Sequence, residues 1–135
     1  MNWQNLGGGK IPFKIRRLFY SYASEEGIVR GAHANRISEF VLISVLGTLK
    51  VKVDDGKRTD VYNLDSPSKG VYIPQMIWKE MYDFSEDNVL LVVSNRHYDN
   101  TEYIRDYEEY RQKIAESDKE IRKQDNKPIS CCLYK

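Results

Sequence analysis

The sequence predicts an all-β protein, a sandwich or barrel of short strands followed by one C-terminal helix. Segments with strand character recur at short intervals, and turn-forming residues separate them. The 135 residues include ten tyrosines and four phenylalanines, and aromatic side chains fit pleated, half-buried surfaces best. A chain of this length is close to the usual size of one domain, so we expect a single core.

Seven segments carry the strand pattern. The predicted strands are Ile15–Tyr20, Ser38–Val45, Thr48–Val53, Thr59–Leu64, Val71–Pro74, Lys79–Phe84 and Asn88–Ser94. The turn sequences between them include Asp54-Asp55-Gly56, Ser66-Pro67-Ser68-Lys69-Gly70 and Ser85-Glu86-Asp87. Strands at this spacing are typical of an antiparallel sandwich or barrel.

The two ends of the chain differ from its middle in composition. Residues 1–10 contain three successive glycines without a phosphate-loop pattern, and we expect a flexible lead-in there. Residues 11–100 form the predicted β domain. From residue 101 to about 122 the chain is rich in Glu, Lys, Arg and Tyr, with weak helical periodicity, which predicts a helix packed on the sandwich. Residues 123–135 are expected to be a tail.

Charge and cysteine content exclude several classes of function. The 21 basic and 20 acidic residues leave a net charge of +1, which disfavours binding to nucleic acid or to an anionic membrane. No segment resembles a secretory leader or a membrane span, so we expect a cytoplasmic protein. Cys131 and Cys132 are adjacent, which suits neither an ordinary disulfide nor a zinc site, and we expect both to be tail residues.

A cluster of polar residues surrounds His33. Arg30 and Gly31 precede it, and on a regular strand Asn35 and Glu39 would share its face. That face changes from polar to aliphatic along the chain, as expected for a strand that runs from the open mouth of a barrel into its floor. The full set predicted on one face is His33, Asn35, Ile37, Glu39, Val41 and Ile43.

The other face of the same segment carries Phe40 and Leu42, for which a dimer interface is one explanation. His33 alone could be a core histidine, but the convergent polar groups favour a functional site. A metal site is disfavoured, because Asn35 is a poor ligand and the segment 70–79 contains no histidine. A transition metal needs about three or four good donors. We therefore predict neither a metal nor a cofactor.

Seven separate segments occur in the order of a known family. They are residues 11–17, 30–34, 53–56, 70–74, 78–85, 98–99 and 103–107. Together they resemble the sugar 3,4-ketoisomerase family over about residues 11 to 110. The resemblance implies a cupin jelly-roll sandwich, commonly dimeric, that uses no metal. It further implies that a thymidine-diphosphate (TDP) 4-keto-6-deoxyhexose is the substrate. The ketone would move from carbon 4 to carbon 3, in the synthesis of deoxysugars for surface glycans such as lipopolysaccharide.

Ketone migration through an enediol needs a base and donors to the enolate oxygen. His33 is the predicted base, because imidazole titrates near neutrality. Asn35 and Lys79 are the predicted donors, each worth about 3 kcal/mol in a water-poor site. We expect Arg17 and Arg30 to bind the diphosphate, because guanidinium groups match phosphate oxygens.

Two further residues complete the predicted site. Tyr20 is expected to stack on the nucleotide base or to bond the sugar, and Glu39 is expected on the same face as His33. In the family a second histidine stands at the position of Asn35, and a histidine or arginine often stands at that of Lys79. Asparagine cannot exchange protons. Three functions therefore stay open: an isomerase, a nucleotide-sugar-binding protein without catalysis, and a related epimerase.

Overall fold

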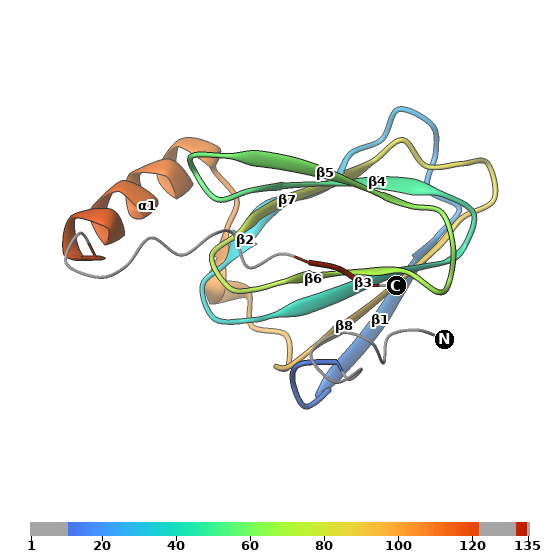
Figure 1. Ribbon diagram of the computed structural model, residues 1–135, viewed down its shortest axis with the longest axis horizontal. Helices are drawn as coiled ribbons and strands as arrows, with labels where there is room; N and C mark the ends of the chain where they lie inside the picture. The colour runs from blue at the N-terminus through green and yellow to red at the C-terminus, as the bar shows by residue number, and fades with distance from the viewer. Residues whose placement is uncertain (1–10, 122–131, 135) are drawn as a thin grey trace.

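The computed structural model describes residues 11–121 and 132–134, and in these residues two antiparallel sheets face each other with one helix at their end (Figure 1). The predicted sandwich with a C-terminal helix is confirmed. The elements are β1 (Arg17–Tyr22), β2 (Arg30–Asn35), β3 (Phe40–Leu46), β4 (Leu49–Asp54), β5 (Thr59–Leu64), β6 (Gly70–Ile73), β7 (Trp78–Tyr82), β8 (Val89–Ser94), the 3-10 helix η2 (Asn100–Glu102), β9 (Tyr103–Ile104), α1 (Tyr107–Ile121) and β10 (Cys132–Tyr134).

The strand order of the first sheet is β1-β8-β3-β6-β10, and that of the second is β5-β4-β7-β2-β9. Each of the seven predicted strands has an observed counterpart whose ends lie within two residues of those predicted. Alternate residues of both sheets point between the layers and form the main core. Its members are Phe40, Leu42, Leu49, Val51, Val53, Leu64, Val71, Ile73, Ile77, Met81, Phe84, Leu90 and Val92.

The chain changes sheets between His33 and Val41, which corrects the prediction of one continuous face. β2 ends at Asn35 in the second sheet, and β3 begins at Phe40 in the first. The intervening turn reverses the alternation, so Phe40 and Leu42 point into the core. The suggestion that these two residues form a dimer interface was therefore wrong.

The outer face of the first sheet is covered near its centre by the segment that precedes β1. Val41, Ile43 and Val93 form a small cluster there, against which Ile11 and Phe13 pack. The segment therefore adds a short layer outside the sandwich.

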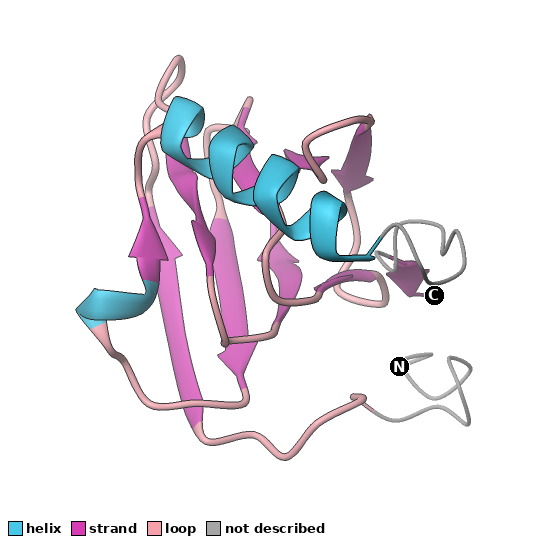
Figure 2. Ribbon diagram, turned by 90° about the vertical axis from the view of Figure 1, so that its left-hand side faces the viewer, coloured by secondary structure: helices cyan, strands magenta, loops and turns pink. Residues whose placement is uncertain are grey.

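Helix α1 begins at Tyr107 and not at residue 101 as predicted. The Asp106 carboxylate accepts a hydrogen bond of 3.0 Å from the Glu109 N–H, the arrangement of an N-cap. The preceding residues instead form η2 and β9, and β9 pairs with β2. In Figure 2 the helix crosses in front of the strands, where Tyr110 and Ile114 pack on the outer face of the second sheet.

The C-terminal tail also differs from the prediction, because Cys132–Tyr134 form β10 beside β6. β10 pairs with backbone groups at the edge of the first sheet, which is a more favourable state than an unpaired edge. The predicted lead-in at 1–10 and Cys131 lie outside the described residues. Among the helices of the described part, none is long and apolar enough to cross a membrane.

Replacing Tyr110 with phenylalanine tests the attachment of the helix. The buried Tyr110 hydroxyl lies 2.9 Å from the carbonyl oxygens of both Asp54 and Met76. The hydroxyl has one proton, so its loss takes the donor from one buried carbonyl oxygen, and we expect the free energy of unfolding to fall by about 1–3 kcal/mol in urea denaturation. Tyr22→Phe, at a side chain that is 67% exposed, is the matched control and should leave stability unchanged. Equal effects of the two substitutions would contradict the assigned role.

Candidate active site

A cavity of about 210 Å³ opens between the two sheets at one end of the main core. Aliphatic and aromatic side chains form its floor, and polar side chains from four strands converge on it. The lining residues are Arg17, Phe19 and Ser21 of β1, Arg30, Gly31 and His33 of β2, Phe40 and Leu42 of β3, Lys79 and Met81 of β7, Leu90 and Val92 of β8, and Tyr103 of β9.

A β-bulge in β2 brings Arg30 and His33 to the same cavity. Residues three apart on a regular strand point to opposite faces. Here Arg30 is opposite Met81 and His33 is opposite Lys79, and the register shifts between Gly31 and His33. Gly31 has a φ of 82°, and a Cβ atom there would lie 3.0 Å from the Lys79 carbonyl oxygen. The local sequence thus needs glycine for the bulge that aims His33 into the cavity.

The His33 imidazole is neutral at physiological pH. Burial, and then the charge of Lys79, lower its pKa from 6.5 to about 4, although the backbone of Gly31 partly opposes them. Its ring lies beside that of Tyr103, with 4.8 Å between the ring centroids. Within the described residues the buried Nδ1 atom has no hydrogen-bond partner. A neutral imidazole that lines the cavity can accept a proton from a bound molecule.

A buried hydrogen-bond network lies behind this wall of the cavity. The Lys79 Nζ atom lies 2.8 Å from Asn35 Oδ1, and Asn35 Nδ2 lies 2.7 Å from Glu102 Oε1. All three side chains are at most 3% exposed. Glu102 also accepts the Ser38 N–H at 3.2 Å. The network therefore fixes which end of the Asn35 amide faces Lys79.

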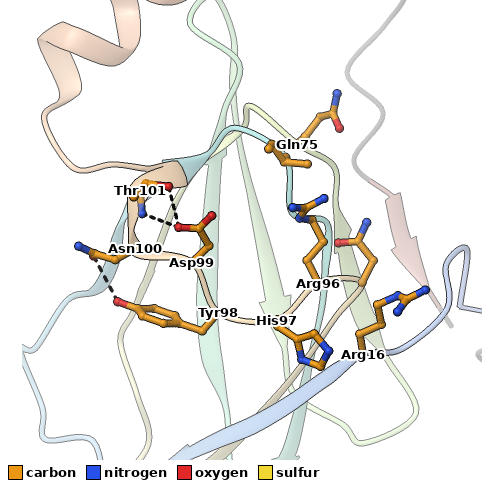
Figure 3. A pocket seen from close by; sticks show the side chains of 10 residues that line it. Arg16, Gln75, Arg96, His97, Tyr98, Asp99, Asn100 and Thr101 are labelled. Atoms are coloured by element: carbon orange, nitrogen blue, oxygen red, sulfur yellow. Dashed lines mark hydrogen bonds between the residues drawn. The ribbon is translucent and has the colours of Figure 1, made fainter.

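A second, more open hollow of about 880 Å³ lies outside the network (Figure 3). Arg96 lines it, and its Nε atom lies 4.0 Å from Glu102 Oε2. Tyr98 also lines it and contacts Tyr103 and Arg17 of the first cavity. Sequence patterns did not predict this hollow. It is lined by Arg16, Ile37, Gln75, Asn95, Arg96, His97, Tyr98, Asp99, Asn100 and Thr101.

Comparison with known proteins agrees with this arrangement. The family model described as "FdtA: WxcM-like, C-terminal" matches residues 4–115. The chain belongs to this ketoisomerase family. It is 40% identical over 105 residues to the TDP-4-oxo-6-deoxy-alpha-D-glucose-3,4-oxoisomerase of Aneurinibacillus thermoaerophilus, covering 78% of this chain and 76% of that protein.

Solved structures of ketoisomerases have the same fold. The TDP-fucose-3,4-ketoisomerase WlaRA of Campylobacter jejuni is 45% identical, with a TM-score of 0.75 over 76% of both chains. A histidine-to-asparagine variant of QdtA from Thermoanaerobacterium thermosaccharolyticum, solved with TDP-4-keto-6-deoxyglucose, is 36% identical. Its TM-score is 0.76, over 78% of this chain and 77% of the other.

Four of the predicted site residues of this ketoisomerase line the cavity, namely Arg17, Arg30, His33 and Lys79. Asn35 does not line it and lies behind Lys79, with both ends of its amide hydrogen-bonded. Its predicted contact with the enolate oxygen is therefore replaced by a contact with Lys79.

Tyr20 and Glu39 do not lie where they were predicted. Tyr20 is on the face of β1 opposite to Phe19 and Ser21, and it is 62% exposed. Glu39 lies beyond the sheet change, where its carboxylate bonds Asn95 Nδ2 at 2.8 Å and accepts from the Tyr72 hydroxyl. In the described part of the chain, no group of three or more His, Cys, Asp or Glu could hold a metal. The absence of a metal stays a prediction.

Tyr103 and Glu102 were missed by sequence reasoning. Both were assigned to the predicted helix, although Asp106 and Glu109 have the spacing of a helix N-terminus. That signal places residues before Asp106 outside the helix. It does not predict their pairing with β2.

Lowering the pH tests the burial of His33. The unfolded chain binds a proton at His33 as the pH falls below 6.5, whereas the folded chain does so only near pH 4. The native state therefore loses stability over this window, by about 2 kcal/mol between pH 7 and 5. His33→Asn removes this part of the pH dependence, which urea denaturation at both pH values measures. Identical losses in both proteins would contradict the lowered pKa.

Lys79→Met tests how much the charge of Lys79 contributes to the lowered pKa of His33. Removing the Lys79 charge should raise the His33 pKa from about 4, while burial keeps it below 6.5. Proton NMR titration of the imidazole signals measures this, and the chain has two histidines, so a His97→Asn variant assigns them. Lys52→Met, at a residue that pairs with Glu80, is the matched control and should leave the pKa unchanged. An unchanged pKa in Lys79→Met would show that Lys79 does not act on His33.

Proposed function

We propose that the protein is a sugar-nucleotide 3,4-ketoisomerase that converts TDP-4-keto-6-deoxyglucose into its 3-keto isomer. The observation that carries this proposal is a neutral, buried imidazole beside a lysine in a small cavity. The chain also belongs to a family whose relatives include a TDP-4-oxo-6-deoxyglucose oxoisomerase. Ketone migration needs these two kinds of group, a base for a carbon-bound proton and a donor for the enolate oxygen.

The size of the cavity indicates that only one part of the substrate enters it. Ligand pockets usually span about 300–1,000 Å³, so a cavity of about 210 Å³ suits the sugar ring and not a whole nucleotide sugar. The diphosphate would then lie at the mouth, near Arg17 and the exposed Arg30. The Arg30 Nε atom lies 2.6 Å from the Ser24 hydroxyl oxygen. This hydrogen bond holds one side of the guanidinium and leaves the terminal N–H groups available to phosphate oxygens.

His33 removes the proton on carbon 3 of the bound sugar. The C–H electrons form a double bond between carbons 3 and 4, and the carbonyl oxygen of carbon 4 becomes the enolate oxygen. Lys79 donates to that oxygen, which stabilises the developing charge in water-poor surroundings. Collapse of the enediol to a ketone at carbon 3 with protonation of carbon 4 completes the isomerisation.

Asn35 favours a second candidate, a protein that binds the nucleotide sugar without converting it. The amide cannot serve as a second acid or base, so catalysis depends on what else can move protons. An epimerase on a neighbouring intermediate is the third candidate, because enolate chemistry with one histidine is common to both reactions. We also keep three predictions: a homodimer, a cytoplasmic location, and supply of deoxysugars to surface glycans such as lipopolysaccharide.

Incubation with TDP-4-keto-6-deoxyglucose in deuterium oxide separates these candidates. An isomerase forms the 3-keto product, which proton NMR detects, and the isotope at carbon 4 reports whether the imidazolium exchanges its proton with solvent before delivery. Exchange without ketone migration would favour the epimerase. Binding in calorimetry with no exchange and no product would favour the binding protein and overturn the proposal.

His33→Asn tests the base directly. We expect kcat to fall by a factor of about 10²–10⁴ with KM little changed, because the residue acts on the proton and not on the nucleotide. His97→Asn, at the other histidine of the chain, should keep the activity of the unaltered protein. A His33→Asn variant with full activity would remove His33 from the mechanism.

A further inference from the structure

We propose that proton transfer takes place on one face of the sugar, with Lys79 as the second acid/base group. This inference rests on the proposed ketoisomerase function and deepens it. It assigns the role that asparagine at position 35 cannot perform. It also predicts the configuration of the product at carbon 4.

The groups that exchange protons belong to one wall of the cavity. His33, Lys79 and Tyr103 come from the neighbouring strands β2, β7 and β9 of the second sheet, and His33 is opposite Lys79 in the register. A flat sugar ring in the cavity therefore meets the imidazole and the ammonium from the same side. The spacing of adjacent strands, about 5 Å, lets the two groups reach adjacent atoms of one ring.

The opposite wall offers no such group among the lining residues that the structure describes. It consists of parts of β1, β3 and β8, and its polar members are Arg17 and Ser21. A guanidinium stays protonated in proteins, and a serine hydroxyl does not titrate near neutrality. The other members of this wall are Phe19, Phe40, Leu42, Leu90 and Val92.

The hydrogen-bond network holds Lys79 in place. Asn35 Oδ1 accepts from the ammonium at 2.8 Å, and Glu102 holds the other end of the amide at 2.7 Å. The Lys79 ammonium also lies over the Phe40 ring, 4.6 Å from its centroid. An ammonium has three N–H bonds, so it can donate to Asn35 and to a sugar oxygen together. Asn35 and Glu102 are thus positioning residues.

The proton steps balance with these two groups alone. Neutral His33 takes the proton from carbon 3, while Lys79 gives a proton to the oxygen on carbon 4, which yields the enediol, an imidazolium and a neutral amine. The amine then takes the proton from the oxygen on carbon 3 as the imidazolium delivers its proton to carbon 4. The ketone is now at carbon 3, and both side chains have returned to their starting states.

Transfer on one face fixes the product. In a sugar of gluco configuration the hydrogens on carbons 3 and 4 point to opposite faces of the ring. A proton delivered to carbon 4 from the face that lost the carbon 3 proton places the new hydrogen on that face. The hydroxyl on carbon 4 then becomes axial, which is the galacto configuration.

The product formed by the unaltered protein tests this inference. The coupling between the hydrogens on carbons 4 and 5 in the proton NMR spectrum reports whether the carbon 4 hydroxyl is axial. An axial hydroxyl supports transfer on one face, and an equatorial hydroxyl overturns it. If no 3-keto product forms at all, the proposed function fails, and that outcome is distinct from an equatorial product.

Chemical rescue tests Lys79. We expect Lys79→Ala to lose at least about 100-fold in kcat, and methylamine or ethylamine to restore part of the rate. The same amines should not restore His33→Ala, and Lys52→Ala should keep full activity. Full activity of Lys79→Ala without amine, or no rescue by any amine, would overturn the role of Lys79. If Lys79→Ala does not fold, the product configuration still decides whether transfer occurs on one face.

Asn35→Ala tests the positioning role. The ammonium loses its acceptor, and a displacement of about 1 Å costs on the order of 100-fold in rate, so kcat should fall while KM stays nearly constant. An increase in KM with kcat unchanged would make Asn35 a substrate-binding residue and contradict the assignment.

Discussion

Both the fold and the site depend on the hydrogen bonds that the buried carboxyl group of Glu102 accepts. It lies between the sheets' connecting turn and the wall of the cavity, where it accepts from the Ser38 N–H and from the Asn35 amide. A buried carboxylate is costly unless such donors surround it. The same group therefore anchors the turn that carries the chain from one sheet to the other and orients the amide that faces Lys79.

Much of the fold could be predicted because the strands obey simple alternation. The core positions of β4 and β5, for example, repeat every second residue between clear turn sequences. The sheet change after Asn35 could not be predicted in this way. The run from Ser38 to Val45 looks the same whether it continues β2 or begins a new strand, and only the packing of Phe40 and Leu42 settles which face is buried.

Site residues could be predicted where the residue type itself suggests a role. They could not be predicted where the fold decides which side chains reach the cavity. Arg30 and His33 line one cavity because of a bulge, and the signal for that bulge is a single glycine. Tyr103 reaches the cavity through a two-residue strand, which is too short for a periodic pattern. Tyr20 has suitable chemistry but lies on the wrong face of β1, since a shift of one residue reverses every side chain of a strand.

The Lys79–Asn35–Glu102 network has a consequence for how this sequence can change over time. A histidine at position 35 would place a second titratable ring beside a buried ammonium and would remove the amide oxygen that accepts from it. An isolated change at position 79 would remove the Lys79 donor from the buried Asn35 oxygen and leave it the interaction with His33, a loss on the order of 1 kcal/mol. Positions 35, 79 and 102 therefore form one epistatic unit. A lineage moving between a two-histidine site and this one has to alter at least two of these positions together, or pass through an intermediate with a less stable fold.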